Sequence, residues 1–324
     1  MTPLHQRFTA VIVNYNGQDL LLDCVRSILE AGLSHEHIVV VDNGSKDDSM
    51  KRLLEHVPNC GNILMGCNAG FAAAVNTALR RVDTEFAVLI NNDARITSTT
   101  LPALLQAFHT HPQAAFIGGR LLNQDGSLQN AIAPFPRLTT EFLPPLLRKI
   151  LRPEQSGRYS AENDIRVESV IGAMFAIRMR ATHQIGLLDE DFFFFLEETE
   201  WCHRATQFGW EVWHVPTAQA LHLQGATAKK FNAMARIEFH RSRLTYFGKT
   251  APEQYPLVLT IAWLKAILNA LTNSIFVLLT LGLSVKIRQK SEVYWKILHW
   301  YVTGRPDDVG LPDKCPASMR TTKS

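Results

Sequence analysis

Residues 86–93 read FAVLINND, five apolar residues followed at once by two amides and a carboxylate. A short run that is apolar on both faces is typical of a strand buried in a parallel sheet with helices on either side. The same pattern occurs at 8–16 (FTAVIVNYN) and at 38–45 (IVVVDNGS). These stretches predict three central strands, each with polar side chains at its carboxyl end.

Helical patterns separate these strands. Segments 20–31, 49–57 and 72–81 have helical spacing, and a further short apolar run lies at 63–65. Strand–helix alternation of this kind predicts an α/β fold with a mostly parallel sheet flanked by helices. Ligands bind such sheets outside the carboxyl ends of the strands. We therefore expect the polar clusters at 14–16, 42–45 and 91–93 to line a ligand site.

Composition narrows the class of protein further. A chain of 324 residues with 46% hydrophobic composition has room for one large core and an appendage. The net charge of +3 is too small for a nucleic-acid-binding surface, so no nucleic-acid partner is expected. The five cysteines are far apart and form no C-x-x-C pair, which favours a reducing cytoplasm over an oxidising compartment. The first residues show no secretory leader pattern.

Two aspartates follow predicted strands and are the candidates for ligand chemistry. Carboxylates such as Asp42 and Asp93 bind ribose hydroxyls or hold a hard cation, Mg²⁺ or Mn²⁺. A departing nucleoside diphosphate builds negative charge, which a metal ion neutralises. The alternative is that both clusters are only turns, for which Asn, Asp and Gly are common.

The later part of the chain adds an acidic cluster and two further strands. Val167–Arg178 and Val212–Val215 are predicted strands, and the proline-rich, basic stretch 134–163 is predicted to be an insertion that forms a lid. Glu197, Glu198 and Glu200 lie at the start of a helix predicted around 198–208. They either cap that helix through its dipole or supply a base that removes a proton from a hydroxyl.

Ordered motifs resemble those of the family 2 glycosyltransferases, most closely the rhamnosyltransferase-like branch. The resemblance covers about residues 8–250. It is carried by NYN at 14–16, VVDNGS at 40–45, N-x-G-F-x-x-x-x-N at 68–76, LINND at 89–93, GAM at 172–174, FFFFLEETEWCHR at 192–204, and His222-x-x-Gly225-x-Thr227.

The resemblance implies a GT-A fold and an inverting displacement at the anomeric carbon of a nucleotide-diphosphate sugar. Asp93 and His222 would then be metal ligands, although residues 91–93 read NND and keep only the last acid of the family's D-x-D-like motif. Glu198 would be the base, with Glu197 and Glu200 as supporting candidates. The implied nucleotide-sugar-binding residues are Asn14, Tyr15, Asn16, Asp42, Asn43, Asn68, Gly70, Phe71, Asn76, Asn92 and Asp93.

The composition changes after Pro252. Residues 266–285 carry no charge and are long enough to cross a bilayer as a helix, and a basic, aromatic segment follows. An interfacial helix pair, a membrane span and a soluble helical cap are the three interpretations. We expect a transferase domain over 1–250 and a helical membrane-associating tail over 251–324, peripheral to or anchored in the inner face of the cell membrane.

Several assignments stay open at this point. The acceptor is a saccharide or a lipid-linked saccharide, and dTDP-L-rhamnose as donor rests on the resemblance alone. A nucleotidyltransferase and an inactive, membrane-tethered sugar-binding protein are the competing functions. Trp201 either stacks on a sugar or lies in the core. Four residues near the end of the domain either grip a pyrophosphate or line a solvated helix face: Arg236, His240, Arg241 and Arg243.

Overall fold

A single large sheet organises the protein. The computed structural model describes residues 6–139, 162–223 and 232–315. Within them, a nine-stranded sheet has the order β3-β2-β1-β4-β10-β6-β11-β5, with β8 paired to β11, and β7 and β9 form a separate ribbon. The strands are β1 (Phe8–Asn14), β2 (Ile38–Asp42), β3 (Gly61–Leu64), β4 (Phe86–Ile90), β5 (Ala94–Ile96), β6 (Ala114–Leu122), β7 (Ile132–Ala133), β8 (Ile165–Arg166), β9 (Ser169–Val170), β10 (Met174–Arg178) and β11 (Glu211–His222).

One strand inside the sheet, β10, runs opposite to both of its neighbours. Strands β3, β2, β1 and β4 run parallel, as the apolar runs predicted. Strand β10 lies antiparallel between β4 and β6, with Met174 opposite Ile90 and Phe175 opposite Gly118. Strand β11 returns parallel to β6. The amino end of β10 therefore lies beside the carboxyl ends of its neighbours.

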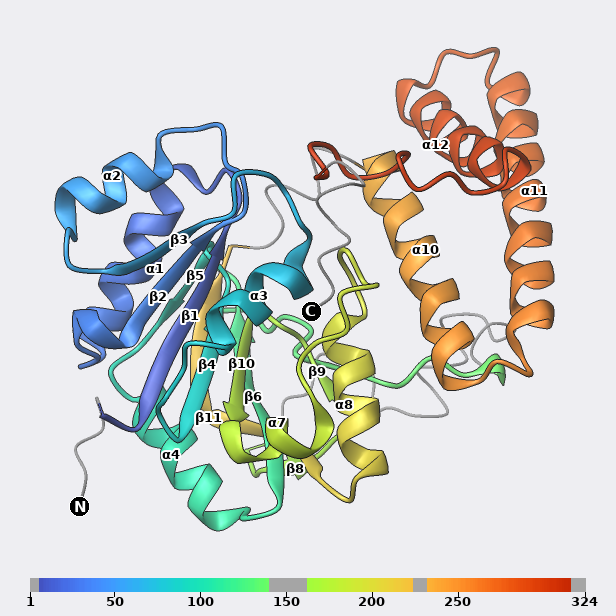
Figure 1. Ribbon diagram of the computed structural model, residues 1–324. Helices are drawn as coiled ribbons and strands as arrows, with labels where there is room; N and C mark the ends of the chain where they lie inside the picture. The colour runs from blue at the N-terminus through green and yellow to red at the C-terminus, as the bar shows by residue number, and fades with distance from the viewer. Residues whose placement is uncertain (1–5, 140–161, 224–231, 316–324) are drawn as a thin grey trace.

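Helices cover both faces of the sheet, which explains why its strands are apolar on both sides (Figure 1). Helices α1, α2 and α4 pack on one face, and α3, α7 and α8 pack on the other. The predicted α/β class is confirmed. The helices and the 3₁₀ turn that the structure describes in this region are α1 (Gln18–Glu30), η2 (His35–His37), α2 (Ser49–His56), α3 (Phe71–Leu79), α4 (Thr100–Thr110), α7 (Met179–Ile185) and α8 (Glu197–Gln207).

Three long helices follow the sheet and stand to one side of it (Figure 1). They are α10 (Asn232–Thr250), α11 (Tyr255–Leu279) and α12 (Val285–Val302). A third core joins them, built around Phe247, Ala262 and Trp300, and it includes Phe192 from the segment before α8. Helix α11 is the one helix of the described residues that is long and apolar enough to cross a membrane.

Some predicted elements differ from the structure. The strand expected over 167–178 is two strands, β9 and β10, because residues 171–173 turn between them. The uncharged stretch 266–285 is not one helix, since α11 begins at Tyr255 and ends at Leu279 and a turn precedes α12. Most of the predicted lid, residues 140–161, lies outside the described residues, as do Gly225 and Thr227.

The wide spacing of the five cysteines gave no indication of a disulfide, but the structure contains one. Cys67 and Cys315 form a disulfide across 248 residues of sequence. The chain after α12 turns back toward the sheet and brings Cys315 to the loop after β3 (Figure 1). The other three cysteines, Cys24, Cys60 and Cys202, are free and buried. Sequence distance between two cysteines does not predict their distance in the fold.

Candidate active site

Asn14, at the end of β1, is the centre of a polar network at the carboxyl edge of the sheet. Its side-chain amide donates to Asp42 Oδ1 at 3.0 Å and to Ser49 Oγ at 2.8 Å, and its Oδ1 accepts from Asn92 Nδ2 at 3.0 Å. Asp42 also accepts from the Ser45 amide at 3.2 Å. The network fixes the ends of β1, β2 and β4 relative to one another, which brings the three predicted polar clusters together.

A second amide pair positions the loop before α3. Asn43 Nδ2 donates to Asn68 Oδ1 at 2.9 Å, and Asn43 Oδ1 accepts from the Ala69 amide at 2.9 Å. Gly70 has φ 97° and ψ 163°, a conformation that only glycine adopts readily. A Cβ at this position would lie 2.8 Å from the Phe193 carbonyl oxygen. The glycine thus permits close contact with the segment that leads into α8, where Phe71 N donates to Phe193 O at 2.8 Å.

Asp93 and His222 lie together at the same edge. His222 Nε2 is 3.3 Å from Asp93 Oδ1, and the two side chains are 12% and 14% exposed. Two backbone links hold them in place: His222 is paired with Ala94 between β11 and β5, and Leu223 N donates to Asp93 O at 3.0 Å. Among the described residues no group of three or more His, Cys, Asp or Glu side chains converges on one point.

Gln129 determines the tautomer of His222. Its side-chain nitrogen faces three acceptors, Asn123 Oδ1 at 2.8 Å and two backbone carbonyls, so the side-chain oxygen, Oε1, faces His222 Nδ1, 2.9 Å away. Nδ1 therefore carries a proton and donates it, which leaves Nε2 facing the Asp93 carboxylate. The lone pair of Nε2 and the carboxylate of Asp93 repel each other unless a positive charge lies between them. A proton on Nε2 or a divalent cation supplies that charge, so the pair fits a metal site.

The acidic cluster begins α8 after a strained approach. Phe195 and Leu196 have φ of 74° and 65°, values uncommon for side chains of this size. Burial and the negative charge of Glu198 raise the pKa of Glu197 well above its usual range. Burial also raises the pKa of Glu198, against backbone hydrogen bonds that lower it. Within the described residues, Oε2 of each glutamate is shielded from solvent and has no hydrogen-bond partner.

The turn before β10 connects Glu198 to the edge that carries Asp93. Gly172 donates a backbone hydrogen bond to the Glu198 carboxylate, and a Cβ at Gly172 would lie 3.9 Å from Glu198 Oε1. The next residue, Ala173, accepts from the Asn91 amide at 3.1 Å. Because β10 is antiparallel to β4, the turn at 172–173 and the segment 91–93 run side by side. Asp93 and Glu198 therefore both lie near this edge of the sheet.

Other candidate residues have different surroundings. The Asn76 side chain bonds to Leu188 N and O at 3.1 and 2.8 Å and to Glu190 at 2.8 Å, so it holds the loop after α7. Glu200 forms an ion pair with Arg204 at 2.8 Å. Trp201 is 0% exposed and donates to Gly186 O, so it belongs to the core and stacks on no ligand.

Tyr15 and Asn16 lie at the rim of the network. Asn16, with φ 53°, accepts from the Lys46 amide at 2.8 Å through Oδ1. The Tyr15 hydroxyl donates to Asp313 Oδ2 at 2.7 Å. Burial, followed by this bond and the charge of Asp313, raises the pKa of Tyr15 to about 12. The hydroxyl is therefore a donor at every physiological pH.

A family model decides the class of the chain. The model of glycosyl transferase family 2 matches residues 9–186, more than half of the chain. The chain belongs to glycosyl transferase family 2. This glycosyltransferase carries the network around Asn14, the pair Asp93–His222 and the turn at 172–173 at one edge, and the first and last of these lie inside the matched region. The family assignment favours glycosyl transfer over nucleotidyl transfer and over a non-catalytic sugar-binding role.

Relatives of the glycosyltransferase share most of its length. N-acetylglucosaminyl-diphospho-decaprenol L-rhamnosyltransferase of Mycobacterium tuberculosis is 24% identical over 227 residues, 65% of this chain and 74% of the relative. The dTDP-rhamnosyl transferase RfbF of Shigella flexneri is 25% identical over 230 residues, 70% of this chain and 72% of the relative.

A solved structure shows the same fold. The mannosyltransferase PcManGT of Pyrobaculum calidifontis, in complex with GDP-Man and Mn²⁺, superposes with a TM-score of 0.52 at 17% identity. The match covers 92% of this chain and 86% of that one. The GT-A-type fold implied by the sequence motifs is confirmed. At this level of identity the match concerns the fold alone.

Sequence patterns missed several residues of the site. Gln129 lies 93 residues from His222, and no local motif marks it. Ser45 and Ser49 complete the Asn14 network through 3.0 and 2.8 Å hydrogen bonds. Ser45 lies in the polar cluster 42–45 that the sequence predicts to line the site, although the sequence assigns it no role of its own. Asp313 is distant in sequence from every motif and had no such signal.

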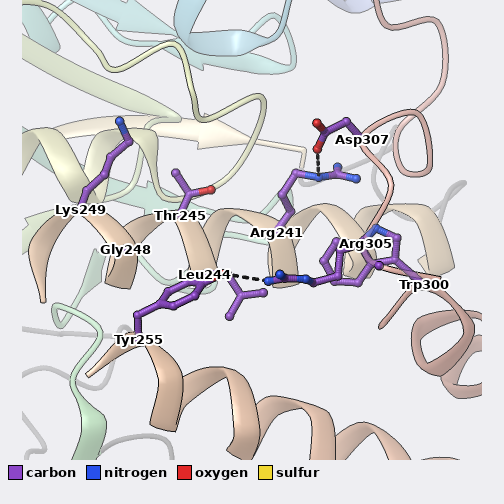
Figure 2. Close-up of a pocket in the computed structure, with 10 residues that line it drawn as sticks. Arg241, Leu244, Thr245, Gly248, Lys249, Tyr255, Trp300, Arg305 and Asp307 are labelled. Carbon is purple, nitrogen blue, oxygen red and sulfur yellow. Dashed lines mark hydrogen bonds and ion pairs between the residues drawn. The ribbon is translucent and has the colours of Figure 1, made fainter. Parts of the chain in front are cut away.

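A separate cavity of about 430 Å³ lies between α10, the start of α11 and the end of α12. Figure 2 shows Arg305 facing Tyr255 across it, with Trp300 beside Arg305. Arg305 Nη1 donates to the Tyr255 hydroxyl at 2.8 Å, and Arg305 forms no ion pair within the described part of the chain. Arg241 is not a solvated helix residue: it donates to the buried Glu238 at 2.5 Å. Burial lowers the pKa of His240 to about 3.

Proposed function

We propose that the chain is an inverting glycosyltransferase that transfers L-rhamnose from dTDP-L-rhamnose to a lipid-linked saccharide at the inner face of a membrane. The observation that carries this proposal is the approach of Glu198 and of the pair Asp93–His222 to one edge of the sheet. The donor is supported by the two relatives, which are named as an N-acetylglucosaminyl-diphospho-decaprenol L-rhamnosyltransferase and a dTDP-rhamnosyl transferase. That this chain uses the same donor is part of the proposal.

In the proposed reaction, Glu198 accepts the proton of the acceptor hydroxyl. The acceptor oxygen forms a bond to the anomeric carbon as the bond from that carbon to the diphosphate oxygen breaks, and the configuration inverts. A carboxylate with an unpartnered, buried oxygen is suited to this role, because burial makes it a stronger base. Glu197, protonated more readily, leaves the negative charge of the pair on Glu198.

The donor would lie over the network around Asn14. Asp42, Asn43 and Asn68 offer hydrogen-bonding groups for the base and ribose, and Asn92 extends the row toward Asp93. Asp93 and His222 would hold Mg²⁺ or Mn²⁺, whose charge stabilises the departing diphosphate when the ion is bound. PcManGT was solved with Mn²⁺, which supports a divalent cation here.

Substitution of the base is the direct test. Glu198→Gln keeps the shape of the side chain and removes its ability to accept a proton, so we expect kcat to fall by about 10²- to 10⁴-fold. Binding of the donor nucleotide, measured by calorimetry, should stay within about twofold because Glu198 does not contact the donor network. Glu200→Gln is the matched control, since Glu200 pairs with Arg204 on the same helix. Full activity in Glu198→Gln would contradict the assignment.

The tail would place the enzyme on the membrane surface. Exposed apolar residues recur on one side of α11 at helical spacing: Leu257, Leu264, Leu268, Leu271, Ile275 and Leu278. The opposite side, with Val258, Ala262 and Ala266, is buried in the third core. A helix that uses one face for packing and presents the other to the outside fits an interfacial position better than a span. Residues 1–250 would then form the transferase and 251–324 the membrane-associating part.

The cavity in Figure 2 would receive a phosphate of the lipid carrier. Arg305 has guanidinium donors beyond the one used by Tyr255, and the cavity borders the start of the helix with the exposed apolar face. We expect Arg305→Gln to raise KM for a lipid-linked acceptor several-fold and to leave KM for the donor unchanged. Equal KM for the acceptor in both proteins would contradict this part of the proposal.

A further inference from the structure

The chain after α12 crosses back to the donor side of the sheet. We define residues Gly310–Cys315 as the C-terminal strap. Asn68 and Lys314 form a parallel β-bridge, with Asn68 N donating to Asp313 O at 3.3 Å and Cys315 N donating to Asn68 O at 2.9 Å. Asn68 is also the partner of Asn43 in the proposed donor site. The strap is therefore in direct contact with a loop that the proposed donor must meet.

The side chain of Asp313 contacts a second part of the donor site. Its Oδ2 accepts from the Tyr15 hydroxyl at 2.7 Å, and its Oδ1 pairs with Lys46 Nζ. These contacts join the strap to the loops after β1 and β2. The strap thus touches all three loops at the nucleotide end of the proposed site, those that carry Tyr15, Lys46 and Asn68.

Lys314 connects the strap to the opposite side of the site. Its side chain is 7% exposed, its Nζ lies 2.7 Å from Oε2 of the fully buried Glu238, and it stands 4.6 Å from the centre of the Phe193 ring. Phe193 belongs to the segment that leads into Glu197 and Glu198. One short segment therefore bridges the donor loops and the approach to the catalytic helix.

The disulfide is the main fastening on the donor side. The Lys46–Asp313 pair is exposed, with 69% and 31% of its side chains accessible, and exposed ion pairs contribute little. One backbone bridge of two hydrogen bonds is also weak by itself. The covalent bond between Cys67 and Cys315, adjacent to Asn68, keeps these weak contacts formed. Loss of that bond leaves them to compete with solvent.

We propose that the C-terminal strap is a redox-controlled wall of the donor site, which holds Tyr15 and the Asn68 loop in the donor-binding arrangement only while Cys67 and Cys315 are joined. This inference rests on the proposed position of the donor. Reduction breaks the S–S bond and forms two S–H groups, with two electrons and two protons supplied by a dithiol that becomes a disulfide. Once released, the loops must be ordered again by the donor, which weakens binding.

The remaining cysteines are poor competitors for this role. Burial raises the pKa of Cys24 and of Cys202 far above the usual range, and burial raises the pKa of Cys60 to about 11. Their thiolate populations at neutral pH are negligible, so they are unreactive. Cys67 follows the exposed Gly66, and this is the side from which a reducing thiol would approach. The redox response is thus confined to one pair.

The test compares donor-nucleotide affinity in three states of the full-length protein. The dissociation constant of dTDP with Mn²⁺ is measured by calorimetry for the oxidised protein, for the same protein after a phosphine reductant, and for Cys315→Ser. We expect reduction to raise the dissociation constant about three- to tenfold, as for one or two side chains that binding must order. Cys315→Ser should show the raised dissociation constant both with and without the reductant.

Asp313 provides a second measurement that a purely structural role would not change. In the oxidised protein, Asp313→Asn should raise KM for the donor with kcat nearly unchanged, and Asp313→Glu should recover part of the affinity. Thiol counting checks the state of each sample. Unchanged or tighter binding after full reduction overturns the inference, and so does a failure of the two thiols to pair in an oxidant. If the oxidised wild type binds no nucleoside diphosphate at all, the proposed function itself fails.

Discussion

Gln129 is the residue that gives His222 its orientation, and its role can be tested without changing either proposed metal ligand, Asp93 or His222. Gln129→Leu removes the acceptor of the Nδ1 proton, so the imidazole can adopt the tautomer that turns an N–H toward Asp93. We expect a loss of roughly 10- to 100-fold in Mn²⁺ affinity, the usual effect of removing such a partner. Affinity is measured by electron paramagnetic resonance with a nucleoside diphosphate present. Ser127→Ala, in the same turn but without contact to His222, is the control.

The raised pKa of Glu198 predicts the pH dependence of the reaction. A base must be ionised to act, so activity is present above the pKa of Glu198 in the folded enzyme and is lost as the pH falls through it. Because burial raises this pKa, the acid limb of the kcat/KM profile should lie above the ordinary glutamate range. The residual activity of Glu198→Gln should lack this limb. An acid limb at the usual glutamate value would show that another group is the base.

At the scale of the element, the loop before α3 depends on Gly70. Gly70→Ala places a Cβ 2.8 Å from a backbone carbonyl oxygen in a conformation that alanine avoids, so we expect a loss of about 2–3 kcal/mol in stability and a weaker donor site. Gly66→Ala is a matched control, because Gly66 also has positive φ but has no atom within 4 Å of the added Cβ. Denaturant unfolding measures both variants. Equal losses would mean that the contact with Phe193 contributes nothing.

The exposed apolar face of α11 is predicted to bind the membrane, and two negative charges placed on it should abolish that binding. Leu268 and Leu271 are 65% and 51% exposed, so Leu268→Glu with Leu271→Glu leaves the core intact. We expect the double variant to lose most of its binding to anionic vesicles in a sedimentation assay, because each burial in lipid is worth about 1.5–3 kcal/mol. Gln106→Glu, on the exposed side of α4, is the control. Undiminished sedimentation of the double variant would favour a soluble helical cap.

The elements also show what the sequence could predict. Strands β1, β2 and β4 were readable because an apolar run followed by polar residues is a local signal. The reversed direction of β10 was not, since it depends on pairing with β4 and β6, which are distant in sequence. The contacts of Gln129 with His222, and of Cys67 with Cys315, span 93 and 248 residues, and single-sequence patterns do not report contacts at such separations.

At the scale of the whole molecule, metal and nucleotide should bind as a unit. Asp93 and His222 are the two proposed metal ligands, and among the described residues no third His, Cys, Asp or Glu side chain converges with them on one point, so the diphosphate would complete the coordination. We expect Mn²⁺ or dTDP alone at 100 µM to shift Tm by about 1 °C or less and the two together by roughly 5 °C. Removal of the ion by a chelator should reverse the shift. Additive shifts would contradict shared coordination.

Strand β10 gives the molecule a property that a wholly parallel sheet would lack. Since it runs against its neighbours, its beginning lies where theirs end, and the turn at 172–173 meets Asn91 across one ladder. The pairing of β4 with β10 therefore fixes the position of the proposed metal ligand Asp93 relative to the turn that contacts the proposed base Glu198. Slippage by one residue would turn every side chain of β10 to the wrong face and misalign both at once. Insertions are therefore tolerable between these strands but not within them.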